Sequence, residues 1–218
     1  MHGWGISPKF MEFQTAGLKK ALPYLDLHYL EAPYDVPPSY ILDEKVKQYT
    51  PDNKFKSWKD AITEDLLVTK KPDFSESVNA LVRYIKEFGP FDGIMGFSLA
   101  GFVVLQFLEK LEGGEIQLDQ PIKFAMFISI NYDKHIPKVL KTPSIHVVGT
   151  RDELLFGANI LNSSSFLNPF VIVHSEGHKF PRLSQGEIDQ LNDFLKPFRR
   201  QAMKAEAEKK AQSQRPKL

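Results

Sequence analysis

The sequence contains no cysteine among its 218 residues, which excludes disulfide bonds and zinc sites built from thiolates. It also lacks an apolar run long enough to cross a bilayer. No charged-then-apolar signal peptide stands at the N-terminus. These absences favour a soluble, intracellular protein, with the cytoplasm as the first choice. Location in an organelle is the alternative if the natural N-terminus is longer.

Charge is distributed unevenly, although the chain as a whole carries only +1. The segment from Lys196 to Leu218 holds eight Lys or Arg against two Asp or Glu, a net +6, so the rest carries −5. A basic end on an acidic body is typical of a solvated or partner-binding tail. We therefore expect one globular domain over residues 1–198 and a basic polar tail over residues 199–218.

Short apolar runs typical of strands alternate with amphipathic stretches typical of helices. Strands are expected at Leu25–Leu30, Phe91–Met95, Lys123–Ile130, Pro143–Gly149 and Pro169–Ser175. Helices are expected from Ser75 or Ser77, either of which could be the cap, to Gly89, over Ala100–Leu111, and over Ser184–Phe198. The runs are continuously apolar, which indicates a mostly parallel sheet with helices on both faces, an α/β fold.

The stretch GIMGFSLAG places Ser98 where a predicted strand turns directly into a predicted helix. One interpretation is a nucleophile on a strand-to-helix elbow, which needs small neighbours such as Gly96 and Ala100. The other is a serine that caps the helix. The Gly-x-Ser-x-Ala match alone is weak, but the strand before it and the helix after it favour the elbow.

Two further polar residues follow later strands. Asp152 follows IHVVGTR, and His178 follows VIVHSEG. Active sites of such sheets lie at the carboxyl ends of the strands, and serine, acid, histidine is the α/β-hydrolase order. His178 would then act as the general base for Ser98, Asp152 would fix its tautomer, and the N–H of Leu99 could face the oxyanion. Considered alone, Asp152 could also be a helix cap or a turn residue. His174 competes with His178 but falls inside a predicted strand.

Several segments together resemble the FSH-type serine hydrolases, a branch of the α/β-hydrolases. The similarity is carried by HGWGISPKFMEFQTAGLKKAL, LHYLEAPYDVP, Trp58, EFGPFDGIMGFSLAG, KFAMFISI, PSIHVVGTRDELL and HSEGHKFP. The resemblance implies the α/β-hydrolase fold and esterase or thioesterase chemistry on small acyl esters, without a cofactor or metal. It assigns the triad to Ser98, Asp152 and His178. It also implies a second oxyanion donor, the backbone N–H of Trp4.

The elbow departs from the family pattern, which usually continues as Ser-Gln-Gly. Here the order is Ser98, Leu99, Ala100, so Gly101 comes one place late. Ala100 adds one methyl group where the helix and strand pass closely. The missing glutamine removes a polar side chain beside the nucleophile.

The start of the sequence departs as well, because an apolar strand in the centre of the sheet usually precedes the HG pair. Here only Met1 precedes His2. We expect either that the sequence starts inside a longer natural chain or that another segment fills the slot. The structure should accordingly have a gap or a donated strand between Leu25–Leu30 and Phe91–Met95.

Two functions stay open from the sequence. The chain is an active serine hydrolase, or it is a hydrolase-fold subunit of a larger assembly with a structural role and reduced or no catalysis. We expect the tail beyond Phe198 to leave the body as a helix or extended arm that contacts a protein partner. Nucleic-acid binding is less favoured, because the tail has no interleaved aromatic residues and the body is acidic.

Overall fold

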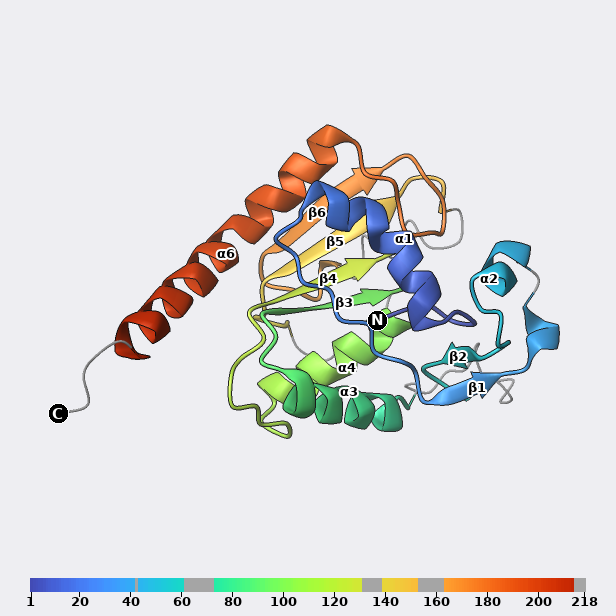
Figure 1. The fold of residues 1–218 in the computed structure, drawn as a ribbon, viewed down its shortest axis with the longest axis horizontal. Coiled ribbons are helices and arrows are strands. Elements are labelled where there is room, and N and C mark those ends of the chain that lie inside the picture. Colours follow the sequence, from blue (N-terminus) through green and yellow to red (C-terminus); the bar gives the residue numbers. More distant parts are fainter. Residues whose placement is uncertain (42, 61–72, 131–138, 153–162, 214–218) are drawn as a thin grey trace.

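The computed structural model describes residues 1–41, 43–60, 73–130, 139–152 and 163–213. At its centre lies a four-stranded parallel sheet in the order β3-β4-β5-β6 (Figure 1). These strands are Gly93–Phe97, Phe124–Ile128, Ser144–Gly149 and Pro169–His174. Each strand pairs in parallel with the next one in the sequence, so their carboxyl ends meet at one edge.

Helices cover both faces of this sheet (Figure 1). The helices α3 (Ser75–Phe88) and α4 (Ala100–Glu112) lie on one face, and α1 (Pro8–Ala21) and α6 (Gln185–Ser213) lie on the other. Buried apolar side chains form two clusters that follow this division. The layering confirms the predicted α/β fold.

The described part of the segment between α1 and α3 forms regular structure of its own. It contains a small antiparallel sheet of β1 (Tyr34–Val36) and β2 (Phe55–Ser57). Two short helices, η1 (Pro38–Tyr40) and α2 (Glu44–Gln48), lie between these strands. Trp58 follows β2 and is fully buried.

The strand predicted at Leu25–Leu30 is wrong, because this segment has no strand assignment. A strand needs a neighbour that supplies N–H and C=O groups. Among the described residues, β3 pairs with a strand on its β4 side only. The local pattern of Leu25–Leu30 suits a strand, but no described strand forms backbone hydrogen bonds with it.

The predicted slot beside β3 is a gap that only Met1 begins to fill. The α-amino group of Met1 donates to Met95 O at 2.7 Å, and the carbonyl of Met1 accepts from Phe97 N at 3.3 Å. No strand within the described ranges continues this contact along β3.

The serine cap predicted for α3 is also wrong. Phe74 occupies the cap position, and Ser75 and Ser77 lie inside the helix. The carboxylate of Asp73 accepts from the Ser75 N–H instead, and Ser77 Oγ donates to Trp58 O. A carboxylate thus satisfies a free N–H of the first turn.

The helix α6 is 29 residues long and continues past Pro197 (Figure 1). Its last turns leave the body as a helix, which is the geometry predicted for the tail. The domain boundary at residue 198 stays a prediction, since the helix crosses it without a break. Within the described ranges, no helix has the length and hydrophobicity needed to cross a membrane.

Candidate active site

Ser98 stands on a tight turn between β3 and α4. Its φ of 53° lies in the left-handed region that few residues other than glycine adopt. Its N–H donates to Ile128 O at 3.0 Å, and its carbonyl accepts from Gly101 N at 2.9 Å. Leu99, not Ser98, occupies the N-cap of α4. The cap interpretation of Ser98 is therefore wrong, and the geometry is that of an elbow.

Two glycines allow the close packing of this elbow. A Cβ at Gly96 would lie 2.9 Å from the carbonyl carbon and oxygen of Ala100, and a Cβ at Gly101 would lie 2.2 Å from Ile130 Cγ2. Ala100 itself is fully buried and fits. Packing therefore explains why the glycine stands at position 101 and not at position 100, because α4 approaches Ile130 at Gly101.

The structure brings the side chains of Ser98, His178 and Asp152 into one row. Ser98 Oγ lies 2.9 Å from His178 Nε2, and His178 Nδ1 lies 2.9 Å from Asp152 Oδ2. The carboxylate of Asp152 is 2% exposed, whereas the imidazole of His178 is 42% exposed. Because Nδ1 faces a carboxylate, it carries the proton in the neutral ring, and Nε2 is left to accept from the serine.

The loops that carry Asp152 and His178 are held together at the ends of β5 and β6. Thr150 N donates to His174 O at 2.8 Å, and Arg151 N donates to Glu176 O at 3.2 Å. A Cβ at Gly149 would lie 2.3 Å from Glu176 O. The two loops therefore touch through backbone, which limits how far Asp152 and His178 can separate.

His174, the competing histidine, has a structural position. It lies in β6, is 3% exposed, and accepts from Glu176 N through Nδ1 at 3.2 Å. Burial lowers its pKa, which favours the neutral ring that this hydrogen bond requires. His178, not His174, lies beside the serine hydroxyl.

His2 fixes the loop that passes next to Ser98. Its Nε2 accepts from Ala32 N at 3.2 Å, so Nδ1 carries the proton and donates to Gly3 O at 2.8 Å. Its own carbonyl accepts from Trp58 Nε1 at 2.6 Å. Burial lowers the pKa of His2 to about 3, which keeps the ring neutral. This supporting role was not predicted from the sequence, where the HG pair was its only signal.

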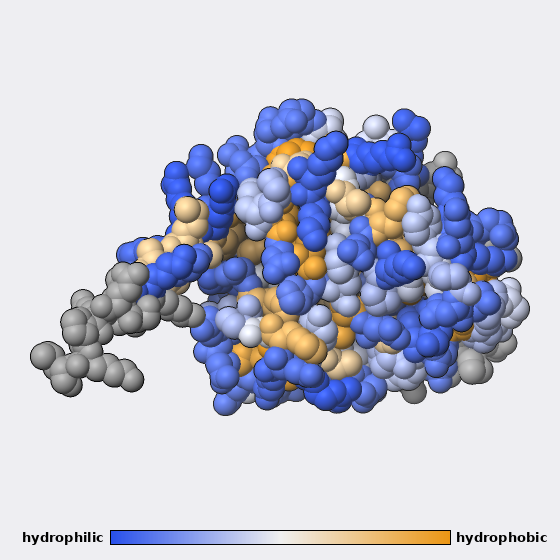
Figure 2. Space-filling model, in the orientation of Figure 1, coloured by the Kyte–Doolittle hydropathy of each residue, from blue (hydrophilic) through white to orange (hydrophobic). Residues whose placement is uncertain are grey.

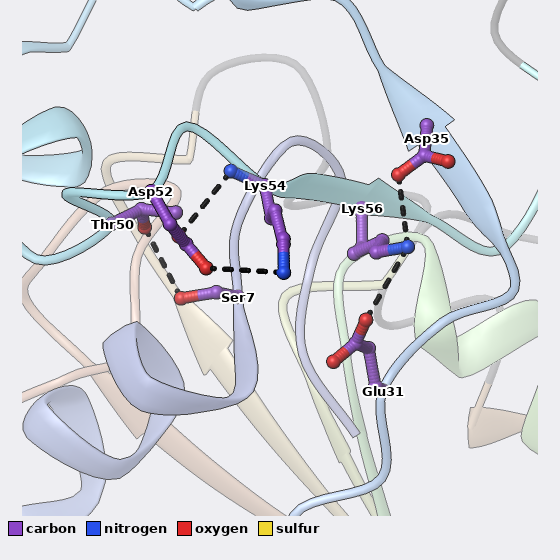
Figure 3. Close-up of polar contacts among 7 residues, drawn as sticks. All are labelled: Ser7, Glu31, Asp35, Thr50, Asp52, Lys54 and Lys56. Atoms are coloured by element: carbon purple, nitrogen blue, oxygen red, sulfur yellow. Dashed lines mark hydrogen bonds and ion pairs between the residues drawn. The ribbon is translucent and has the colours of Figure 1, made fainter.

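Lys56 holds the same loop from the side of β2 (Figure 3). Its carbonyl accepts from Gly5 N at 2.9 Å, and its ammonium lies 2.8 Å from Asp35 and 3.3 Å from Glu31. The hydrogen bond with Asp35 is the main reason why the pKa of Lys56 is raised. The loop is thus enclosed between β2 and the segment that begins at Glu31.

The predicted oxyanion donors lie on segments that adjoin Ser98. A Cβ at Gly3 would lie only 3.5 Å from Ser98 Cβ, so the loop of Gly3 and Trp4 runs beside Ser98. Leu99 is the N-cap of α4, at the end of the helix where N–H groups have no partner within the helix. Within the described part of the chain, no group of three or more His, Asp or Glu is arranged to hold a metal ion.

Comparison with known proteins adds to this geometry. A family model described as serine hydrolase (FSH1) matches residues 1–189. The chain is 36% identical over 121 residues to the esterase C25G4.2 of Caenorhabditis elegans, a match that covers 51% of this chain and 54% of that protein. It is 30% identical over 186 residues to family of serine hydrolases 3 of Saccharomyces cerevisiae, covering 74% of this chain and 68% of the yeast protein. The chain thus spans about half the length of the nematode esterase.

Among solved structures, a carboxylesterase from Mesorhizobium loti matches with a TM-score of 0.58 and 14% identity, covering 89% of this chain and 85% of that one. This likeness identifies the architecture as the α/β-hydrolase fold. At this level of identity it describes the fold alone.

Proposed function

The chain belongs to the serine hydrolase (FSH1) family, and from that premise we propose that it hydrolyses small acyl esters or thioesters through an acyl intermediate on Ser98. The observation that carries the proposal is the row of hydrogen bonds from Ser98 Oγ through the imidazole of His178 to Asp152. A serine hydroxyl is a weak nucleophile until an adjacent base removes its proton, and this row supplies the base.

In the first half-reaction, Ser98 Oγ attacks the acyl carbon while its proton moves to His178 Nε2. The carbonyl oxygen becomes an oxyanion, and the backbone N–H groups of Trp4 and Leu99 are the proposed donors to it. When the intermediate collapses, the bond from the acyl carbon to the leaving oxygen or sulfur breaks. His178 then gives its proton to the leaving alcohol or thiol.

In the second half-reaction, water attacks the acyl group on Ser98 and gives a proton to His178. Collapse releases the carboxylic acid and returns that proton to Ser98 Oγ. Asp152 accepts from His178 Nδ1 throughout and stabilises the imidazolium that forms in each half. Its burial keeps water from competing for this hydrogen bond.

Labelling with a fluorophosphonate tests the nucleophile directly, because this probe reacts only with an activated serine. We expect stoichiometric labelling of the native protein and none of Ser98→Ala. Ser129→Ala is the matched control, because Ser129 also follows a strand, is buried, and has a positive φ of 49°. Equal labelling of Ser98→Ala and the native protein would refute the assignment.

Hydrolysis of aryl ester and acyl thioester substrates tests the reaction itself. Ser98→Ala should remove essentially all activity, whereas Trp4→Ala should have a smaller effect because its proposed donor is backbone. A folded native protein that neither labels nor turns over any of these substrates would favour the alternative, a hydrolase-fold subunit with a structural role. The family match gives that alternative no support.

Two finer predictions concern partners and location. The basic residues beyond Phe198 are a proposed contact for a protein partner, supported by their net positive charge and by the course of α6 away from the body (Figure 1). The intracellular location rests on the sequence arguments alone and stays a prediction.

A further inference from the structure

His174 is a polar side chain in the interior, where most buried side chains are apolar. Polar side chains predominate on the face of the molecule that Figure 2 shows, whereas His174 lies in β6 and is 3% exposed. Its Nε2 is buried and has no hydrogen-bond partner in the part of the chain that the structure describes. A buried donor without a partner is unfavourable. Leucine or phenylalanine would therefore suit this position better if packing were the ring's sole role.

The ring makes one hydrogen bond to the backbone, and that bond acts on the loop of His178. Its Nδ1 accepts from Glu176 N at 3.2 Å. The carbonyl of Glu176 accepts in turn from Arg151 N at 3.2 Å. Glu176 is thus held at its N–H by a side chain of β6 and at its carbonyl by the loop that follows β5.

The position of Glu176 determines where the side chain of His178 begins. Only Gly177 separates Glu176 from His178. On the other loop, Arg151 directly precedes Asp152. The two loops are in close contact here, since a Cβ at Gly177 would lie 3.2 Å from Arg151 O. A shift of Glu176 would therefore change the distance from His178 Nδ1 to Asp152 Oδ2, which is 2.9 Å.

The ring of His174 is itself confined, so its acceptor has a fixed place. A Cβ at Gly149 would lie 2.9 Å from Cε1 of the ring, and the carbonyl of His174 accepts from Thr150 N at 2.8 Å. On the outside of the loop, the carboxylate of Glu176 lies 2.8 Å from Lys179 Nζ, on a side chain that is 58% exposed. Ion pairs with an exposed partner contribute little, so the ring is the stronger constraint on Glu176.

We propose that His174 is a positioning residue for the hydrolysis proposed above, on which this inference rests. Its Nδ1 holds the N–H of Glu176 and so keeps His178 at hydrogen-bond distance from Asp152. A general base must stay in place through both half-reactions, and a displacement of about 1 Å lowers the rate by about a hundredfold. His174 itself exchanges no proton with the substrate.

A matched pair of substitutions separates the acceptor from the bulk of the ring. His174→Leu removes the acceptor, whereas His174→Asn keeps one, because the Oδ1 of asparagine is as many bonds from Cβ as the Nδ1 of histidine. We expect kcat for aryl ester hydrolysis to fall at least about tenfold in His174→Leu and to stay within about threefold in His174→Asn, with KM little changed in both. Should His174→Leu fail to fold, His174→Phe takes its place, since it keeps a ring without the acceptor.

His146→Leu is the control, because His146 is also a buried histidine of the sheet. Its Nε2 lies 3.1 Å from Ser144 Oγ, at the end of β5 opposite to Asp152. This variant should lose stability but keep its kcat. An equal fall of kcat in His146→Leu and His174→Leu would overturn the proposal, because lost stability would then explain both.

Crystal structures of the native protein and of the two His174 variants give a measurement that does not depend on turnover. The distance from His178 Nδ1 to Asp152 Oδ2 should exceed hydrogen-bond reach in His174→Leu and stay near its native value in His174→Asn. An unchanged distance or an unchanged kcat in His174→Leu would overturn the proposal. A longer distance in a protein that turns over no ester or thioester would support the positioning contact and count against the hydrolytic function alone.

Discussion

Replacement of Gly101 by alanine tests whether the elbow depends on close packing. The new Cβ would lie 2.2 Å from Ile130 Cγ2, whereas carbon atoms in contact lie about 3.5–4.0 Å apart. The overlap exceeds about 1 Å, so α4 or Ile130 must move, and overpacking of this kind costs about 1–3 kcal/mol. Alanine in a helix regains up to about 1 kcal/mol over glycine. We expect Gly101→Ala to lower the free energy of unfolding by about 1–2 kcal/mol.

Gly17→Ala is the control, because Gly17 also lies in a helix but has open space around its Cα. It should raise the free energy of unfolding by up to about 1 kcal/mol. Urea unfolding of both variants measures these changes, and the slope of the free energy of unfolding against urea concentration should stay constant. Esterase activity of Gly101→Ala should fall as well, since Gly101 N holds the carbonyl of Ser98. If both substitutions were stabilising, the close-packing argument would be refuted.

Three further predictions concern protonation, the triad and the tail. His146 lies in β5 and is buried, as His2 is. Between about pH 7 and pH 5 the free energy of unfolding should fall by about 2 kcal/mol for each of these histidines, because burial holds both folded pKa values at about 3 and the unfolded chain takes up protons below about 6.5. The stabilisation by the two neutral histidines is fully present above this pH range and is lost as the pH falls. Urea unfolding at pH 7 and at pH 5 measures the change, and equal free energies of unfolding at the two pH values would contradict the prediction. Asp152→Asn should lower kcat by about 10³–10⁴ without loss of folding, and an unchanged aryl-ester rate would exclude a role for this carboxylate. Limited trypsin digestion of the isolated protein should cleave first beyond Phe198, at exposed sites such as Arg200; a resistant tail would argue against a free arm.

Much of the sheet could be predicted from the sequence, because parallel strands buried on both faces are continuously apolar. The strands from Lys123, Pro143 and Pro169 begin within one residue of their predicted starts. The strand predicted from Phe91 begins two residues later, at Gly93. The end of α3 at Gly89 was also predicted correctly, and α4 ends at Glu112, one residue beyond the predicted Leu111. Local pattern was sufficient at these positions.

The errors arise where a distant segment decides the local structure. Leu25–Leu30 has the pattern of a strand but pairs with no strand among the residues that the structure describes. Ser77 could have been a cap, but its hydroxyl bonds Trp58 O. The helix α1 was missed, although Ser7 as cap, with Oγ accepting from Phe10 N, and proline at the first position were readable signals.

The order of the candidate site residues could be predicted, but not what supports them. Strand-end positions pointed to Ser98, Asp152 and His178, because the strands of a parallel sheet end at one edge. The buried bonds of His2 with Ala32 and Trp58 join residues far apart in the sequence. Sequence spacing carries no trace of such contacts.

Because Ser98 has a left-handed backbone, selection for stability and selection for catalysis favour different residues at this position. Glycine adopts a φ of 53° without strain, whereas serine there costs about 1 kcal/mol or more. A library of variants sorted only for thermal resistance should therefore enrich Ser98→Gly, and the enriched proteins should be more stable and inert. Under a screen for turnover the same substitution should vanish. The residue at this one turn would then report which pressure a population of variants has experienced.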